Sequence, residues 1–353
     1  MLFSPKIRGF FVEKNDHSWM MARVSSLALP FVVEELKEIP LSDVEGLKTA
    51  SQQLLAGKSQ SGYLNAVCGI NPPKRLIRRA TVEIKRAKEP NYLNEVCVQQ
   101  LRIEPDKFTL AALNASDGSE FDLNKPAGKE IVICGMPSED IVSMQDSLLQ
   151  SSIYPTRIEL GTVASLGAAI DYLSTIDNKA PTLLLEIGSE STQSFIIGTN
   201  GVETSRPIPY GIDAMIPVVH KKLNLKDEES ARKLFLSNTF DFTSMGPELV
   251  QRLLKELQSS IGFYEVQTGQ SISQLICISL PPKLGWIETA IAGSLGVTAV
   301  KVDLVSWLKS HRIALSENAS RVGIDSRWFG LFSLMVSYHN PEAANAAPAE
   351  KKA

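Results

Sequence analysis

Short apolar runs separated by polar turns follow one another through the first seventy residues. Residues 7–13 and 18–27 are mostly apolar and flank a polar turn at Lys14-Asn15-Asp16, a pattern that predicts a hairpin. The apolar stretch 63–71 predicts a further strand, which ends at Pro72-Pro73 because proline cannot donate to a continuing ladder. A helix is predicted over residues 42–56.

A smaller unit is predicted over residues 73–155. The stretch between its inner strands, 114–129, is rich in Gly, Asp and Asn and predicts a loop. A strand over 157–160 and a helix over 163–173 follow this unit, and the helix contains small residues that allow close packing. The predicted elements of the unit are strands 76–84, 108–114 and 130–134 and helices 91–101 and 138–151.

The second half of the chain opens on a group of three strands. Residues 182–186 contain the apolar run Leu183-Leu184-Leu185, and Asn200-Gly201 is a strong signal for a tight hairpin turn. Residues 247–268 carry an apolar stripe at helical spacing and predict a helix about 30 Å long. The remaining predictions are strands 193–197, 202–207, 275–278 and 297–302 and helices 211–223, 227–238, 286–295 and 328–338.

The succession of three strands, a helix, a strand and a helix appears twice, starting near residues 7 and 182. The halves are not similar in sequence, so only the architecture is duplicated. We therefore expect two sheet-based lobes. Lobe one is predicted over 6–178 with an inserted subdomain at about 73–155, lobe two over 179–340 with a helical subdomain at about 223–270, and a flexible tail over 341–353.

Composition excludes several classes of protein. The 353 residues carry a net charge of -3, which gives no general attraction to nucleic acid or to anionic membranes. The N-terminus lacks a signal-peptide pattern, and no apolar run approaches the roughly 20 residues of a membrane span. We therefore expect a cytoplasmic protein that reaches a membrane only through partners. The cysteines Cys68, Cys97, Cys134 and Cys277 are dispersed and predict buried, reduced thiols, and no metal site is predicted.

The clearest chemical signal lies between Glu186 and Thr192. A tight turn between two strands exposes consecutive backbone N–H groups, and such a nest can bind an anion. Gly188 lets a ligand approach the backbone. The hydroxyls of Ser189, Ser191 and Thr192 can donate hydrogen bonds to phosphate oxygens. The carboxylate at the strand end can hold a hydrated Mg²⁺ ion. The alternative is an ordinary hairpin with a polar tip.

Several segments together resemble the PilM family, the actin-like cytoplasmic proteins of type IV pilus assembly. The resemblance extends over most of residues 7–338 as an ordered set of weak motifs. The segments that show the resemblance are Leu185-Glu186-Ile187-Gly188-Ser189-Glu190-Ser191-Thr192, Arg206-Pro207-Ile208-Pro209-Tyr210-Gly211, the helix end 256–264, the strand 275–279, and residues 66–70, 78–82 and 102–105.

The resemblance implies an α/β, actin-like (ribonuclease H-like) two-lobed fold with an inserted small subdomain in lobe one. It also implies ATP binding through two phosphate loops and an adenosine loop. If that binding is retained, the implied nucleotide-binding residues are Glu186, Gly188, Ser189, Ser191, Thr192, Glu256 and Ser279, and no residue is predicted to be catalytic.

The sequence departs from this pattern at each nucleotide element. In the first hairpin Phe11 takes the position that the family gives to aspartate, and no glycine follows it. After Ser279, Leu280-Pro281-Pro282 replaces a glycine run, and we expect Leu280 to occupy space needed by a nucleotide. Glu186 stands in place of aspartate. These changes argue against ATP and Mg²⁺ as cofactors and against turnover, unless Lys14, Asp16 and Ser18 substitute for the missing groups.

The leading functional hypothesis is a scaffold of the type IV pilus platform, peripheral to the inner membrane. By resemblance, its partners are the cytoplasmic tail of a PilN-like membrane protein, other platform proteins and motor ATPases, and not nucleic acid. The segments 66–84 and 155–170 are where the tail is expected to bind. The alternatives are an active Mg-ATP-dependent actin-like ATPase and a cytoplasmic component of a type II secretion system. The basic stretch 74–88 is interpreted as a solvated strand edge. The alternative is a surface that faces anionic lipid headgroups or an acidic partner.

Overall fold

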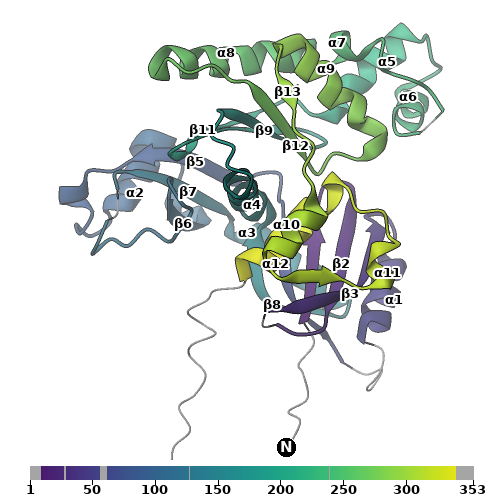
Figure 1. Cartoon of the computed structure of the whole chain (residues 1–353), viewed down its shortest axis with the longest axis horizontal. Coiled ribbons are helices and arrows are strands. Elements are labelled where there is room, and N and C mark those ends of the chain that lie inside the picture. Colours follow the sequence, from purple (N-terminus) through teal and green to yellow (C-terminus); the bar gives the residue numbers. More distant parts are fainter. Residues whose placement is uncertain (1–8, 28, 56–61, 127, 238, 339–353) are drawn as a thin grey trace, which may run out of the picture. The chain divides into compact units, whose positions relative to one another are not determined.

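The computed structural model describes residues 9–27, 29–55, 62–126, 128–237 and 239–338 (Figure 1). It is a mixed α/β structure with three sheets. The predicted tail 341–353 and the first two residues of the predicted strand 7–13 lie outside the described residues. Two compact units are formed, one from residues 1–71, 142–168 and 303–353 (unit 1), the other from residues 72–141 and 169–302 (unit 2).

Unit 1 is built on a six-stranded sheet in the order β14-β3-β2-β1-β4-β8. The central strand β1 pairs antiparallel with β2 and parallel with β4, and β8 forms one edge. The strands are β1 (Gly9–Lys14), β2 (Ser18–Val24), β3 (Phe31–Pro40), β4 (Leu64–Ile70), β8 (Ile153–Leu160) and β14 (Ile313–Leu315). The helices are α1 (Val44–Leu55), α3 (Ser138–Gln150), α4 (Gly161–Thr175), α10 (Leu304–Ser310), α11 (Glu317–Ser320) and α12 (Phe329–Tyr338), with the ends of α3 and α4 reaching into unit 2.

Helices cover the six-stranded sheet by burying their apolar sides. Leu47 and Leu54 of α1 and Leu148 of α3 pack on strand residues such as Val12 and Leu64. The Asp43 carboxylate accepts a hydrogen bond from the Gly46 N–H at 2.8 Å and so satisfies one orphan donor where α1 begins. The apolar helix α12 packs against β1, β2 and β4.

Unit 2 contains a five-stranded sheet in the order β11-β10-β9-β12-β13 and a three-stranded sheet in the order β5-β7-β6. The strands are β5 (Leu76–Thr81), β6 (Phe108–Asn114), β7 (Glu130–Pro137), β9 (Thr182–Ile187), β10 (Thr192–Gly198), β11 (Gly201–Ile208), β12 (Gln274–Ile278) and β13 (Thr298–Ala299). The helices are α2 (Tyr92–Val96), α5 (Ile216–Lys222), α6 (Glu228–Phe235), α7 (Gly246–Leu249), α8 (Gln251–Thr268) and α9 (Gly285–Leu295).

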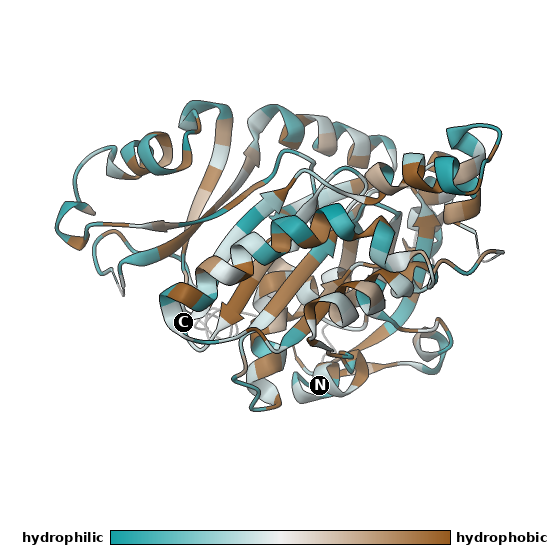
Figure 2. Ribbon diagram, turned by 90° about the horizontal axis from the view of Figure 1, so that it is seen from above, coloured by the Kyte–Doolittle hydropathy of each residue, from teal (hydrophilic) through white to brown (hydrophobic). Residues whose placement is uncertain are grey.

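The core of unit 2 lies between the five-stranded sheet and its helices. Leu183, Leu185 and Ile187 of β9 are almost fully buried and belong to one apolar cluster with residues of α5, α8 and α9. Figure 2 shows strands that are largely brown, whereas the helices carry teal residues as well. This contrast is expected, because a strand covered on both faces needs apolar residues throughout and a surface helix needs only an apolar stripe.

Hydrogen bonds join the three-stranded sheet to the edge strand β11. The Ser205 hydroxyl donates to the Ile77 carbonyl, and the Arg79 guanidinium donates to the Glu203 carbonyl. The Val202 N–H donates to the Ala115 carbonyl at 3.0 Å. The sheet that the sequence analysis placed in an inserted subdomain is therefore tied to β11 within one compact unit.

Most predicted elements are present, but several helices and strands differ from the prediction. The sequence analysis did not predict β3, α10, β14 or α11. The predicted helix 247–268 is two helices, α7 and α8, which are separated at Val250. The predicted helix 91–101 continues from α2 into a wider π-helical turn, Cys97–Leu101. All four cysteines are buried free thiols as predicted, and burial raises the pKa of Cys68 to about 12.

None of the helices in the described ranges is long and apolar enough to cross a membrane. The same ranges contain no group of three or more His, Cys, Asp or Glu side chains that could hold a metal ion.

Gly201 offers a test of the connection between β11 and the small sheet. Its φ is +85°, and a Cβ atom there would lie 2.1 Å from the Ala115 carbonyl oxygen. Gly201→Ala should therefore disrupt the Val202–Ala115 hydrogen bond as well as strain the backbone. Gly118 is the matched control, because its φ is +71° but a Cβ would meet nothing within 4 Å.

Urea denaturation of the two variants should separate the two costs. Gly118→Ala should lower the free energy of unfolding by about 1–2 kcal/mol, the cost of the left-handed conformation. Gly201→Ala should cost about 1–3 kcal/mol more, the cost of an unsatisfied buried backbone group. If the two variants lose the same free energy of unfolding, the contact between Gly201 and Ala115 does not contribute to stability.

Candidate functional site

The turn between β9 and β10 is short and closed by its own backbone. The Gly188 N–H donates to the Ser191 carbonyl at 2.9 Å, directly beyond the last ladder pair, Ile187 with Thr192. The predicted strand, turn and returning strand are therefore present, and the turn lies where the central strand of the sheet ends. Residues 188–191, with Glu186 and Thr192, are hereafter called the β9 turn.

The beginning of a helical segment supports the β9 turn from one side. The Ile212 N–H donates to the Gly188 carbonyl at 3.0 Å, and the Asp213 N–H donates to the Ser189 carbonyl at 2.9 Å. A Cβ on Gly211 would lie within about 2.5 Å of both carbonyl oxygens (2.5 and 2.4 Å), so only glycine permits this approach. The carbonyl groups of Gly188 and Ser189 thus have partners.

Three N–H groups of the β9 turn remain available. The N–H groups of Ser189, Glu190 and Ser191 donate no hydrogen bond to any part of the chain that the structure describes. Ser189 and Ser191 are partly exposed and Glu190 is exposed, so these donors lie at the surface of unit 2. Consecutive N–H groups of this kind can bind an anion by donating hydrogen bonds to it. The predicted hydroxyl of Thr192, by contrast, is buried and donates to the Tyr210 carbonyl at 2.7 Å.

The carboxylate of Glu186 is held by an arginine. Glu186 Oε2 lies 3.1 Å from Nη2 of Arg75, and the two side chains are only 6% and 3% exposed. Arg75 immediately precedes β5, and its Nη1 donates to the Pro72 carbonyl at 3.1 Å. The guanidinium is therefore fixed in place by its own turn as well as by Glu186.

This ion pair changes what Glu186 can do. A carboxylate that holds Mg²⁺ supplies negative charge to the cation. Here the positive charge of Arg75 already balances Glu186, and a metal ion would have to displace the guanidinium. Displacement would leave Arg75 buried without its counter-charge, which typically costs about 3–5 kcal/mol. The sequence analysis missed Arg75, because it interpreted the basic stretch 74–88 as a solvated strand edge.

Ser279 lies close to the β9 turn. It follows β12, whose last residue, Ile278, is paired with Glu186, so the two strands end side by side. Ser279 is buried and has a φ of +60°. Leu280, which was expected to fill nucleotide space, is instead buried in the apolar core of unit 2. That interpretation was wrong, because the chain turns Leu280 inward toward the core.

Glu256 is paired elsewhere. It lies on α8, and its Oε2 lies 2.5 Å from Nη2 of Arg206 on β11. Arg206 also donates to the Ser260 hydroxyl at 3.0 Å. Because Arg206 is opposite Ser194 in the ladder, this network lies along the body of β10 and β11 and not at the β9 turn.

The first hairpin requires a correction within unit 1. In β9 the glutamate is the next-to-last residue, paired with Gln193 on β10 and Ile278 on β12. The next-to-last residue of β1 is Glu13, paired in the same way with β2 and β4. The residue that corresponds to Glu186 is therefore Glu13 and not Phe11, so an acidic residue is retained there.

Glu13 is fully buried against α12. A Cβ on Gly330 would lie only 1.8 Å from Glu13 Oε1, so α12 provides room for the carboxylate by carrying glycine at this position. Phe11, two residues earlier, is also buried. No signal in the sequence indicated the contact between Gly330 and Glu13, because the residues are more than 300 positions apart.

Comparison with known proteins gives a clear answer for the fold. No protein-family model matches the chain, and no curated protein matches it. Among solved structures, a chain of the PilM–PilN type IV pilus biogenesis complex matches with a TM-score of 0.69 and 17% identity, over 96% of this chain and 100% of that chain. The predicted resemblance to PilM is therefore confirmed for the fold.

Weaker matches include other actin-like proteins. A Bacteroides thetaiotaomicron protein with an actin-like ATPase fold matches with a TM-score of 0.43 and 7% identity, over 84% of this chain and 91% of that one. The cytoplasmic domain of EpsL, an inner membrane component of the Vibrio cholerae type II secretion system, matches with a TM-score of 0.40 and 8% identity, over 97% of both chains. The α/β fold of this chain is the one it shares with the chain of the PilM–PilN complex.

The ion pair between Arg75 and Glu186 can be tested by a double-mutant cycle. Arg75→Met and Glu186→Met should each lower the free energy of unfolding by about 3–5 kcal/mol, because each leaves one buried charge without its partner. The double variant should recover most of this loss. The measurement is urea denaturation of all three variants.

Lys233→Met is the control, since it breaks the exposed i,i+4 pair of Lys233 with Glu229. It should leave the free energy of unfolding almost unchanged. If the losses of the two single variants simply add in the double variant, Arg75 and Glu186 are not coupled.

Proposed function

We propose that this protein is a cytoplasmic scaffold of a type IV pilus assembly platform, held at the inner membrane by the cytoplasmic tail of a PilN-like membrane protein. The single observation that carries the proposal is the likeness to a chain of the PilM–PilN complex, which extends over the full length of that chain. The proposal assigns this protein the role that PilM has in that complex. Other platform proteins and motor ATPases are further proposed partners.

The edge strand β8 is the proposed position for an extended tail. It is the last strand of the six-stranded sheet, with β4 on one side only. An edge strand offers main-chain donors and acceptors to an added strand. Tyr154 on β8 is 51% exposed and offers an aromatic contact beside that edge. β8 also overlaps the segment 155–170 that the sequence analysis singled out.

The proposal includes a degenerate ATP site. Its support is the Arg75–Glu186 ion pair, in which a guanidinium stands where a nucleotide site needs a metal ion. The competing function is an active Mg-ATP-dependent ATPase, and the available N–H groups of Ser189, Glu190 and Ser191 favour it. The property that separates the two functions is whether ATP binding depends on Mg²⁺.

Tail peptides provide the test of the scaffold. Peptides of about 12 residues, matching the cytoplasmic tails of PilN-like proteins from the same genome, should bind the full chain saturably in fluorescence anisotropy. Tyr154→Ala should weaken binding by about tenfold, the loss expected for an aromatic contact worth about 1.4 kcal/mol.

Phe263→Ala is the matched control, because Phe263 is an aromatic residue of similar exposure (61%) on α8 of the other unit. It should leave the affinity unchanged. The scaffold proposal fails if no tail peptide binds better than its scrambled version. If Tyr154→Ala binds the peptide as tightly as the unchanged protein, the tail remains the partner but does not bind at β8.

A further inference from the structure

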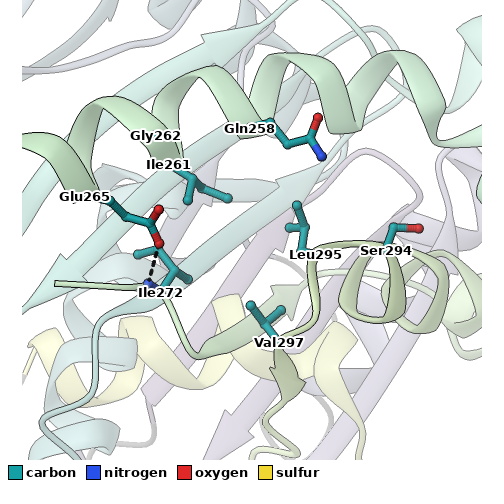
Figure 3. A pocket seen from close by; sticks show the side chains of 8 residues that line it. All are labelled: Gln258, Ile261, Gly262, Glu265, Ile272, Ser294, Leu295 and Val297. Atoms are coloured by element: carbon teal, nitrogen blue, oxygen red, sulfur yellow. Dashed lines mark hydrogen bonds between the residues drawn. The ribbon is translucent and has the colours of Figure 1, made fainter.

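A pocket of about 260 Å³ opens in unit 2 between α8 and the end of α9 (Figure 3). Ile261 on α8 faces Leu295 and Val297 across it, and Ile272 lies below α8 (Figure 3). These four side chains give the pocket apolar walls. The volume exceeds that of any single side chain in the pocket walls, so the pocket has room for a long side chain from another molecule.

The pocket is separate from the β9 turn. Ile272 precedes β12, whereas the β9 turn lies beside Ile278 at the other end of the same strand. Six residues of extended chain span about 20 Å. A ligand in the pocket therefore does not touch Glu186 or Ser279.

One charged side chain, Glu265, lines the pocket. Its Oε1 accepts a long hydrogen bond from the Ile272 N–H at 3.4 Å, which Figure 3 draws as a dashed line. Within the described part of the chain Glu265 forms no ion pair, whereas Glu248 and Glu256 on α7 and α8 are paired with Lys222 and Arg206. A carboxylate among apolar walls favours a ligand that is both cationic and apolar.

Gly262 is a second, independent feature of the pocket wall. It lies in the interior of α8, where glycine is less stable than alanine. A Cβ at this position would meet nothing within 4 Å, so the packing of this chain does not require glycine. The missing side chain leaves space along α8 that an approaching partner backbone can use.

An exposed apolar residue lies beside the pocket on α8. Val266 follows Gly262 by one helical turn and is 88% exposed. An apolar side chain with this exposure, placed beside an apolar pocket, is available for contact with a partner.

We propose that this pocket docks a protein partner by accepting one of its arginine side chains. The aliphatic stem of the arginine packs between Ile261, Leu295 and Val297, and its guanidinium binds Glu265. An apolar residue flanking the arginine in the partner covers Val266, and the partner's backbone passes Gly262. The site is independent of the tail-binding edge at β8 and of nucleotide.

Disulfide tethering tests the chemistry directly on the full chain. Ser294 lines the pocket and is exposed, and the four native cysteines are buried, so Ser294→Cys supplies an accessible thiol. Two disulfide probes compete for it under mild reductant: a short alkyl chain that ends in guanidinium, and the same chain ending in neutral urea. Intact-protein mass spectrometry measures which probe is captured.

The guanidinium probe should be captured at least fivefold more than the urea probe. Adding Glu265→Gln should abolish this preference. Adding Glu228→Gln, which removes the same charge from exposed α6, should leave it intact.

Two results would overturn the proposal. One is equal capture of the two probes at Ser294→Cys and also at Gln258→Cys, a second exposed position in the pocket wall. The other is a preference for guanidinium that Glu265→Gln leaves unchanged, since the carboxylate would then not bind the cation.

Discussion

The buried ion pair between Arg75 and Glu186 is the constraint on which unit 2 depends. It joins the chain just before β5 to the end of the central strand β9, two segments that are more than 100 residues apart. Losing either partner leaves a charge in an apolar interior, so the pair enforces one arrangement of the small sheet and the β9 turn. The bonds from Ser205 and Val202 extend the same connection along β11.

The same pair decides the chemistry of the β9 turn. The turn keeps the features that favour an anion, namely a glycine, three available N–H groups and the support of the segment that starts at Ile212. The acidic residue at the end of β9 is already paired, because the charge of Glu186 is balanced by the Arg75 guanidinium. Glu13 is likewise buried, in unit 1, where Gly330 makes room for it. The six-stranded and the five-stranded sheet thus each keep an acidic residue at the end of a central strand but bury its carboxylate within the unit.

Local patterns predicted the turn and its strands correctly, because β9 contains the apolar run Leu183-Leu184-Leu185 and Gly188 follows directly after the strand. The role of Arg75 could not be predicted, since a basic residue in a charged stretch reveals its partner only when the sheets assemble. The wrong choice of Phe11 over Glu13 is a shift of two residues, and side chains two apart on a strand share a face, so alternation alone does not separate them. β3 was not predicted because its charged residues, among them Glu34, Glu35 and Lys37, interrupt the alternation of apolar and polar positions that marks a strand.

The direct test of this account is the melting temperature of the full chain with millimolar ATP, with and without Mg²⁺. If Arg75 occupies the place of the metal, Mg²⁺ should change the melting temperature in ATP by less than about 1 °C, because there is no linked metal binding. A rise of about 3 °C or more that appears only when ATP and Mg²⁺ are both present would contradict it. Such a rise would show that Glu186 exchanges its guanidinium for a metal and that the site is a working one.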